Sequence, residues 1–533
     1  MYNIRISDAA VFLNISVVAE RRRLSKKAEK VVFKVKGVFM PEIVSLVASD
    51  GSKIDFEDKI IAQGSVKDVY FSVDRTHAIG FYRTPQDSVS MERLQNIVGT
   101  YRQQIISGEA GEYWRQVLCW PESLVEWKGL TGVVLPLYPE NFFFRSGKYA
   151  GKEKEGKWFT SAKLKNRFLP NSEKGTWLSN IRVCIQFVSA VRKLHSMGLA
   201  HSDLSYKNVL ADPQTGRAIV IDLDGLVIPG KFPPSVVGTP DFIAPEVMET
   251  RSLANDNPDK KLPSIQTDCH ALAVLIYMYL LNRHPLRGGK IYNEDPVIDE
   301  ELQMGREALF IEHPEDKSNR PKVEYLKEYE LPQGDVDKVP YTVCGPYLKE
   351  MFDRAFIAGL HNPEKRPSAA EWEDALIKTA DEMIPCSNSK CLQKWFVYSE
   401  DTNLVCPFCN RVYRKKLVNL EFAEKTPDGN QVSSGYRLAV EKGHNLLKRH
   451  LEPADWVKSS GDKPLASFLR LFGASFLFNR NAGGMFRIMP DGSRKKMGIN
   501  SLTRLRDGMV IEIDDNGKTV VITPSVKSHI KNE

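Results

Sequence analysis

The chain has 533 residues, and because one hydrophobic core rarely extends beyond about 300 residues, we expect two to four domains. Apolar residues make up 42% and charged residues 26%, which describes an ordinary globular protein and excludes a disordered or fibrous chain. The net charge of +7 is modest for this length and argues against a dedicated nucleic-acid-binding protein.

No segment of the sequence is suited to a membrane. The longest apolar run, residues 271–281, is too short to span a bilayer and predicts a buried core helix. The N-terminus lacks the charged and then apolar layout of a signal peptide. Four of the eight cysteines cluster at metal-ligand spacing, which favours a reducing environment. We therefore expect a cytoplasmic protein with no membrane partner.

The first predicted elements follow an N-terminal extension, residues 1–55. Short apolar segments that contain glycine predict strands joined by tight turns, and a 3.6-residue period predicts a helix. In chain order these elements are two strands within 61–70 around Gly64, a strand at 78–83 around Gly80, a helix from Ser88, and a buried strand at 133–137.

A long helix is predicted over residues 177–197, where apolar residues recur at helical spacing. It leads into the polar segment His201–Asn208, in which Asp203 stands five residues before Asn208. The apolar run 218–221 predicts a buried strand that ends at Asp222.

Three later segments complete a recognisable order. They are residues 238–246, which end in Ala-Pro-Glu, residues 268–274, which begin with Asp268, and residues 361–367, which contain Arg366. Together with the Asp203 segment, they resemble the landmarks of eukaryotic-like protein kinases, over residues 56–383. The resemblance implies an α+β protein with a two-lobed, protein-kinase-like fold.

The resemblance also implies chemical roles. In that family the first Asp orients or deprotonates the acceptor hydroxyl, while the Asn and the second Asp hold magnesium on the nucleotide phosphates. Asp203 is then catalytic, Asn208 and Asp222 bind Mg²⁺, and Asp224 assists a second metal ion. An alternative alignment gives the family position of Asp222 to Asp224 instead. The implied cofactors are ATP and Mg²⁺.

Lys67 stands out because the family lysine of the third strand is missing, and Gly80 occupies its position. The with-no-lysine kinases place their lysine on the second strand, and the segment around Lys67 resembles theirs. Lys67 is then the implied phosphate ligand, although a solvated strand lysine is the alternative. Glu92 is its implied helical partner. The other implied nucleotide-binding residues are Gly64, Ser65, Leu135 and Leu137.

Other departures from the family bear on rate and regulation. Ser202 replaces the Arg that usually pairs with a phosphorylated activation loop, which suggests activity without that switch. Ser205 replaces the lysine that stabilises the transferring phosphate, with Lys207 as a nearby substitute. Thr239 and the absence of tyrosine-kinase signatures favour serine or threonine as the acceptor. Residues 289–340 look like an insertion on the surface of the second lobe.

Four cysteines after the kinase-like region predict a metal site. Two pairs, each with short internal spacing, can wrap one tetrahedral Zn²⁺, and a closed four-thiolate set leaves no position for a reacting water. The zinc is therefore predicted to be structural, in a zinc ribbon over residues 384–416; redox pairing of the thiols is the rival interpretation. The predicted ligands are Cys386, Cys391, Cys406 and Cys409.

The remaining residues, 417–533, alternate short apolar segments with turn signals, which predicts a small β-sandwich-like domain. Residues 505–513 resemble the closing strand of forkhead-associated domains, but the Gly-Arg and Ser-x-x-His that hold phosphothreonine there are not evident. We therefore expect a β-rich module for protein contacts.

The combination of an atypical kinase domain, a zinc ribbon and a β tail resembles bacterial kinases encoded with tellurite-resistance and stress-response proteins. It implies an ATP- and magnesium-dependent serine/threonine kinase whose partner is a protein substrate from the same stress-response operon. Two rivals stay open. One is a pseudokinase scaffold that binds nucleotide and partners without phosphotransfer, and the other is a nucleic-acid-associated regulator that acts through the ribbon and its basic neighbours.

Overall fold

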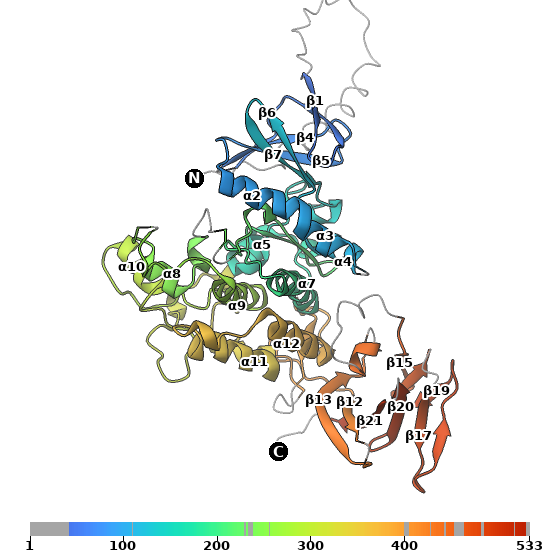
Figure 1. The fold of residues 1–533 in the computed structure, drawn as a ribbon. Helices are drawn as coiled ribbons and strands as arrows, with labels where there is room; N and C mark the ends of the chain where they lie inside the picture. Colours follow the sequence, from blue (N-terminus) through green and yellow to red (C-terminus); the bar gives the residue numbers. More distant parts are fainter. Residues whose placement is uncertain are drawn as a thin grey trace, which may run out of the picture. The chain divides into compact units, whose positions relative to one another are not determined.

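The computed structural model describes residues 42–528, with short gaps at 65, 109, 229–230, 233–237, 255, 399–403, 427, 442–443, 452–462, 481–483 and 516–517 (Figure 1). The chain divides into two compact units. Of the described residues, the first unit contains those up to Lys174 together with Lys193–Leu275, and the second contains Gly175–Arg192 and those from Ile276 onward. The predicted domain boundaries are a finer division than these two units and stay predictions.

The first unit begins with an antiparallel five-stranded sheet in the order β3-β4-β5-β7-β6. Because side chains alternate along a strand, one face carries an aromatic cluster and the other faces the site described below. Phe56, Tyr70, Phe81 and Trp127 form that cluster. The strands are β3 Ala62–Gln63, β4 Lys67–Phe71, β5 His77–Tyr82, β6 Ser123–Trp127 and β7 Leu130–Pro136, with a separate pair β1 Ile43–Val47 and β2 Lys53–Glu57.

Helix α2, Ser88–Asn96, packs against this sheet through Leu94, which contacts Leu124 and Val133 (Figure 1). The carboxylate of Asp87 accepts a hydrogen bond from the backbone N–H of Ser90 and caps the helix. The helical pattern expected from Ser88 is thus present. It continues as η1 Ile97–Tyr101, α3 Arg102–Ile106 and α4 Gly111–Val117.

The rest of the first unit consists of short elements that hold loops. The paired strands β8 and β9 position the segment that contains Asp222, as the apolar run 218–221 predicts. The elements are η2 Glu140–Phe142, α5 Lys157–Thr160, α6 Ala162–Phe168, η3 Asn171–Glu173, β8 Val209–Asp212, β9 Arg217–Val220, η4 Leu223–Gly225, η5 Pro240–Phe242 and α8 Pro245–Thr250.

Two long helices contribute residues to both units. Helix α7, Trp177–Ser196, confirms the helix predicted over 177–197, and its periodic apolar residues, including Ile181 and Val188, are buried. Helix α9, Ile265–Leu281, is apolar on all sides in its second half and is buried there. It confirms that the longest apolar run is a core helix. None of the helices in the described part of the chain combines the length and apolar character of a membrane span.

The second unit continues with helices whose packing corrects one expectation. Residues 289–340 are not simply a surface insertion, because Asn319 is fully buried and its amide donates to the carbonyls of Leu286 and Leu309. Phe310 is buried as well. The elements are α10 Pro296–Met304, η6 Val323–Tyr325, η7 Glu328–Glu330, η8 Tyr341–Cys344, α11 Pro346–Asp353, η9 Arg354–Ala358, η10 Pro363–Lys365 and α12 Ala369–Asp381.

The C-terminal part consists of antiparallel strands in two sheets, ordered β13-β12-β21-β20-β17-β18 and β14-β15-β16-β19. They follow a small pair, β10 Met383–Pro385 and β11 Trp395–Val397. The short strands predicted after residue 417 are therefore present. They are β12 Leu417–Lys425, β13 Gln431–Ala439, β14 Asn445–Leu446, β15 Ala466–Leu471, β16 Ala474–Asn479, β17 Met485–Ile488, β18 Arg494–Lys496, β19 Leu502–Arg504, β20 Val510–Asp515 and β21 Lys518–Lys527, with η12 Lys448–His450.

This β-rich part is tied to helix α12 by a buried charge cluster. The guanidinium of Arg449 donates to both carboxylate oxygens of Asp381, at 2.5 and 2.7 Å, and the hydroxyl of Tyr436 donates to the same carboxylate at 2.6 Å.

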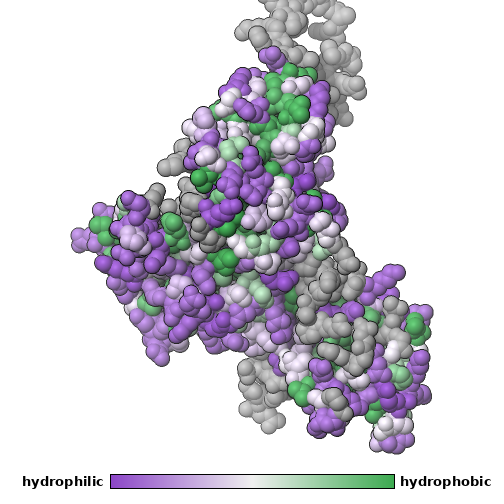
Figure 2. Space-filling view, viewed as in Figure 1, coloured by the Kyte–Doolittle hydropathy of each residue, from purple (hydrophilic) through white to green (hydrophobic). Residues whose placement is uncertain are grey.

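On the molecular surface, hydrophilic residues cover most of the face shown in Figure 2, and hydrophobic residues gather over strands of the first unit.

Candidate active site

Asp203 lies in the loop between α7 and β8, and two side chains hold its carboxylate, Asn208 from the same loop and Thr239 from a later segment. The amide of Asn208 donates to the backbone carbonyl of Asp203 at 2.7 Å and to its carboxylate at 3.1 Å. The hydroxyl of Thr239 donates to the other carboxylate oxygen at 2.9 Å. Asn208 and Thr239 are buried, whereas Asp203 is half-buried. The carboxylate is therefore fixed in orientation while it keeps access to solvent.

A buried aspartate, Asp268, holds the start of this loop in place. The carboxylate of Asp268 accepts hydrogen bonds from the backbone N–H groups of His201 and Ser202, at 2.6 and 3.1 Å, and lies 3.1 Å from the ring of His195. Ser202 has a φ of 67°, a conformation that costs a non-glycine residue energy and needs such support. The ring of His201 contacts the carbonyl of Ile221 at 3.0 Å, a structural role.

Two aspartates follow strand β9 and face different surroundings. Asp222 has a φ of 63°, and its side chain is 53% exposed. Asp224, in the short helix η4, is almost completely buried, with a side chain only 2% exposed. A buried carboxylate needs a counter-ion and hydrogen-bond donors, whereas water can solvate an exposed one. Asp224 therefore depends on its protein partners, and Asp222 is open to contact with other molecules.

Lys67 is the main partner of these acids. Its ammonium lies 2.6 and 2.9 Å from the two carboxylate oxygens of Asp224 and 3.4 Å from Asp222. The hydroxyl of Tyr82 donates to Asp224 at 2.5 Å. Strand pairing places Tyr82 directly opposite Lys67, and Gly80 lies on the same face two residues earlier. A Cβ at Gly80 would lie 3.4 Å from Cδ of Lys67.

The electrostatics follow from this geometry. Burial alone would lower the pKa of Lys67, but the carboxylates of Asp224 and Asp222 outweigh it and raise the pKa. Burial would raise the pKa of Asp224, yet Lys67 and the Tyr82 hydroxyl hold it below its usual value. The network therefore contains an ammonium and a carboxylate at neutral pH.

Two cavities meet at this cluster. One, of about 430 Å³, is mainly apolar; its lining includes Val69, Ala78, Leu135, Leu137 and Phe143, and it also contains Asn208. The other, of about 460 Å³, is polar and includes Gly64, Tyr82, Arg93, Asp203 and Asp224. Lys67 and Asp222 line both cavities.

Most of the site residues predicted from the sequence thus line one or both cavities. Ser65 lies outside the described residues. Glu92 is the exception, because its side chain is 54% exposed and lies 3.0 Å from the ammonium of Lys231, so the expected pairing with Lys67 is not what the structure contains. The neighbouring residue on α2, Arg93, is buried and lines the polar cavity instead.

Sequence reasoning missed Tyr82 and Arg93. Tyr82 could have been found by pairing strands, since it stands two residues after the position of the missing lysine. Arg93 could not have been found from the sequence. Successive side chains on a helix point about 100° apart, and the sequence does not say which of residues 92 and 93 faces the cavity.

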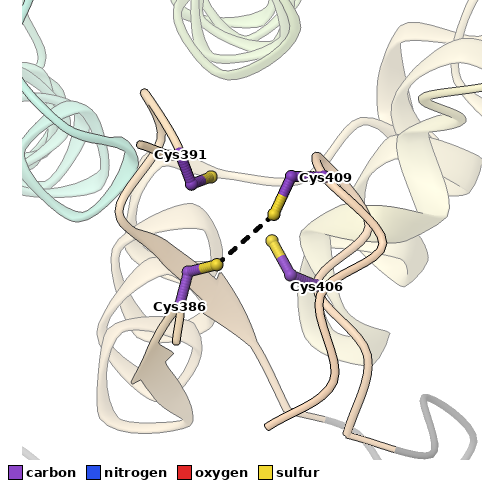
Figure 3. A group of neighbouring side chains, drawn as sticks. All are labelled: Cys386, Cys391, Cys406 and Cys409. Carbon is purple, nitrogen blue, oxygen red and sulfur yellow. Dashed lines mark hydrogen bonds between the residues drawn. The ribbon is translucent and has the colours of Figure 1, made fainter. Parts of the chain in front are cut away.

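The four predicted cysteines also come together, in the second unit (Figure 3). Their sulfur atoms all lie within 4.8 Å of one another, and those of Cys386 and Cys409 are 3.5 Å apart. Zn–S bonds of about 2.3 Å in a tetrahedron would set the sulfurs about 3.8 Å apart, so the four thiols fit a zinc ion. Cys391 and Cys406 are buried, and none of the four forms a disulfide.

Comparison with known proteins gives the same picture for part of the chain. Residues 165–373 match the protein kinase domain family. The chain is 37% identical over 73 residues to a dual serine/threonine and tyrosine protein kinase of Apis mellifera, and 39% identical over 69 residues to the Homo sapiens protein of that name; these matches cover 14% and 13% of this chain. It is 34% identical over 106 residues, 19% of this chain, to the death-associated protein kinase dapk-1 of Caenorhabditis elegans.

The chain covers only 7% of the length of each of these relatives. A solved structure, the kinase domain of a Toxoplasma gondii rhoptry antigen, aligns with 70% of this chain and 96% of its own, at 11% identity and a TM-score of 0.38. The match to the protein kinase domain family, together with the helices and sheets described above, indicates a mixed helix and sheet protein with a protein-kinase-like fold. The matched residues include Asp203, Asn208, Asp222 and Asp224, whereas Lys67 precedes them.

The site also fits the groups that such a fold implies. An apolar cavity of about 430 Å³ lies in the range usual for small-molecule sites, and it is large enough for an adenosine group. The amide of Asn208 and the half-exposed carboxylate of Asp222 offer the oxygen ligands that Mg²⁺ prefers. Lys67 supplies a cation beside them.

Proposed function

We propose that this chain is an ATP- and magnesium-dependent protein kinase that transfers the γ-phosphate to a serine or threonine of a partner protein. The observation that carries the proposal is the convergence of Lys67, Asp203, Asn208 and Asp222 on two adjoining cavities, one apolar and one polar. A phosphoryl-transfer site needs little more than correct positioning and electrostatic stabilisation of charge.

Each residue has a part that its position supports. The apolar cavity, with Leu135 and Leu137, would hold the adenine, and Lys67 would contact the phosphates. Asn208 and Asp222 would hold magnesium, which when bound neutralises phosphate charge. Asp203, held by Asn208 and Thr239, would orient the acceptor hydroxyl and accept its proton.

The relocated lysine is part of this proposal. Gly80 stands at the family position of the lysine, and its missing side chain leaves the space that Lys67 occupies from the neighbouring strand. Both positions point to the same face of the sheet, so an ammonium from either one reaches the same region. The loss at position 80 and the gain at position 67 therefore compensate each other.

Two other departures predict the behaviour of the enzyme. Ser205, in place of a phosphate-stabilising lysine, is fully buried beside Thr239, and Lys207 is exposed, which predicts slow transfer. Ser202, in place of the usual arginine, predicts activity without phosphorylation of the activation segment.

The remaining parts would serve structure and recruitment. The four cysteines would bind one structural Zn²⁺, closing a zinc ribbon. The C-terminal sheets would recruit the protein substrate. The architecture resembles that of bacterial kinases encoded with tellurite-resistance and stress proteins, so we expect a cytoplasmic kinase whose substrate comes from the same stress-response operon.

The direct test is phosphorylation with labelled ATP and magnesium by the full-length wild type and by Lys67→Ala and Asp203→Ala. We expect label in the wild type and a loss of it in both variants. Lys53→Ala is a matched control, because this lysine is exposed on β2 and pairs with the surface carboxylate of Asp55. If label survives Lys67→Ala but not Asp203→Ala, the chain is a kinase, but Lys67 does not take the role of the missing lysine.

A pseudokinase scaffold is the second candidate, and one observation favours it. Lys67 is engaged by both Asp222 and Asp224, so nucleotide and metal must displace an ion pair before they bind. Absence of label from the wild type across a panel of protein substrates, with ATP still bound, would select the scaffold.

A further inference from the structure

The carboxylate that positions Lys67 comes from an unexpected element. In the expected arrangement, a glutamate of helix α2 would hold the ammonium. The structure instead shows Glu92 on the outer side of α2, paired with Lys231, with both side chains more than half exposed. An ion pair so exposed is screened by water and contributes little. In this structure Glu92 therefore pairs with Lys231, and the carboxylates beside Lys67 are those of Asp222 and Asp224.

Asp224 has the burial and the contacts needed to hold the ammonium of Lys67. Its side chain is only 2% exposed, and its two oxygens lie 2.9 and 2.6 Å from the Lys67 ammonium. The Tyr82 hydroxyl donates to one of those oxygens at 2.5 Å, and the ammonium lies 5.4 Å from the centre of the Tyr82 ring. A buried charge persists only when it is paired and hydrogen-bonded, and all three groups meet that condition together.

We propose that Asp224, held in place by Tyr82, is the counter-ion that positions Lys67 and replaces the helical glutamate. This inference deepens the proposed function and rests on it. Tyr82 and Lys67 are direct neighbours across two strands, and Asp224 lies in a short helix after β9. The position of the ammonium is then set by strands β4 and β5 together with η4, and not by the placement of α2.

The inference also separates the two aspartates. The carboxylate of Asp224 already accepts from an ammonium and a phenol, and it is buried. Asp222 is half exposed and lines both cavities. Asp222 is then the metal ligand, and Asp224 is a positioning residue, not the second metal ligand that the sequence suggests.

A double-mutant cycle on the full chain tests this assignment. The variants are Lys67→Ala, Asp224→Asn and the double variant, and the readout is kcat/KM for ATP. Loss of a charge-assisted hydrogen bond predicts a fall of roughly 10- to 100-fold for Asp224→Asn alone. In the Lys67→Ala background the same change should have no further effect. A full additional loss there would overturn the proposal and mark Asp224 as an independent metal ligand.

Milder variants keep the test independent of folding. Tyr82→Phe removes one hydroxyl and should lower kcat about tenfold, the effect of one hydrogen bond to a charged group, while the protein still folds and its magnesium dependence stays unchanged. Tyr70→Phe is the matched control, since Tyr70 lies on β4 within the aromatic cluster of the opposite face. An unchanged kcat in Tyr82→Phe would count against the proposal.

Glu92→Gln distinguishes the two possible anchors. If Asp224 anchors Lys67, the change should alter kcat/KM by no more than about twofold, as expected for an exposed pair. A loss as large as that of Lys67→Ala would restore the helical glutamate and overturn the inference.

The failure of the proposed function would be visible separately. If the wild type transfers no phosphate, the same cycle is read as the affinity for a fluorescent ATP analogue. Non-additive effects of Lys67→Ala and Asp224→Asn on that affinity support the anchor without phosphotransfer, and additive effects overturn it.

Discussion

The candidate active site, called the cleft below, consists of the two cavities that share Lys67 and Asp222. It and the four-cysteine cluster are assembled from the chain in opposite ways. The four thiols come from a short stretch of chain, Cys386 to Cys409, and converge through local turns. In the cleft, Lys67 and Asp224 are 157 residues apart and meet only because strands and loops pack together. A metal site of this kind can be recognised from spacing alone, whereas an ion pair across the cleft depends on the register of the sheet.

The two regions also differ in what they leave open. The cysteine cluster is a closed set of four donors, with no free position for a reacting group. The cleft leaves Asp222 half exposed and Asp203 accessible beside two cavities. The first arrangement suits a structural metal ion, and the second is open enough to admit other molecules.

Removing the proposed zinc ion should have the largest effect. Cys391 and Cys406 belong to a buried cluster with Phe396 and Tyr413, so loss of a zinc ion bound by them would open a core. Because binding to such a site contributes on the order of 10 kcal/mol to folding, a chelator or Cys406→Ser should unfold this region. Circular dichroism and thermal unfolding of the full chain measure it. Ser389→Ala, between the paired cysteines, should be neutral, and an unchanged melting curve in Cys406→Ser would show that no metal contributes.

Asp203→Asn tests whether the cleft does chemistry. Loss of a general base predicts a fall in kcat of roughly 10²- to 10⁴-fold. The affinity for ATP should change little, since Asp203 lines the polar cavity and not the apolar one. Initial rates and nucleotide titration give the two quantities. A variant that loses ATP affinity with kcat unchanged would contradict the assigned role.

Asp381→Asn probes the buried ion cluster beside α12. Breaking a buried pair should cost about 3–5 kcal/mol, measured by urea unfolding. Burial would raise the pKa of Asp381, but Arg449 and His450 hold it well below 3.8. The wild type should therefore keep this stabilisation above about pH 4 and lose it as the pH falls further. Equal acid sensitivity in the variant and the wild type would argue against it.

Gly80→Lys in the Lys67→Ala background is the subtlest test of the cleft. Both positions face the same region, so a lysine at 80 should recover roughly tenfold of the 10²- to 10³-fold that loss of one phosphate donor costs. Gly80→Gln in the same background controls for side-chain size. Equal rates in the lysine and glutamine variants would show that the two positions are not interchangeable.

Much of the cleft could be predicted because its chemistry is local. Asp203 and Asn208 lie in one loop, and Asp222 directly follows a buried apolar strand, so the resemblance to protein kinases could be read from short segments of sequence. Glu92 could not be placed in the same way. Whether residue 92 or 93 of a helix faces the sheet depends on the rotation of α2 around Leu94, which packs on Leu124 and Val133.

The sequence by itself determined the types of element, the local loops and the metal-binding spacing, since these depend on residues close together in the chain. Only the tertiary structure decided which carboxylate holds Lys67, and that Asn319 is buried. The physical reason is the same in both cases. Hydrogen-bond partners far apart in sequence are selected by strand register and packing, and neither is encoded in any short segment of chain.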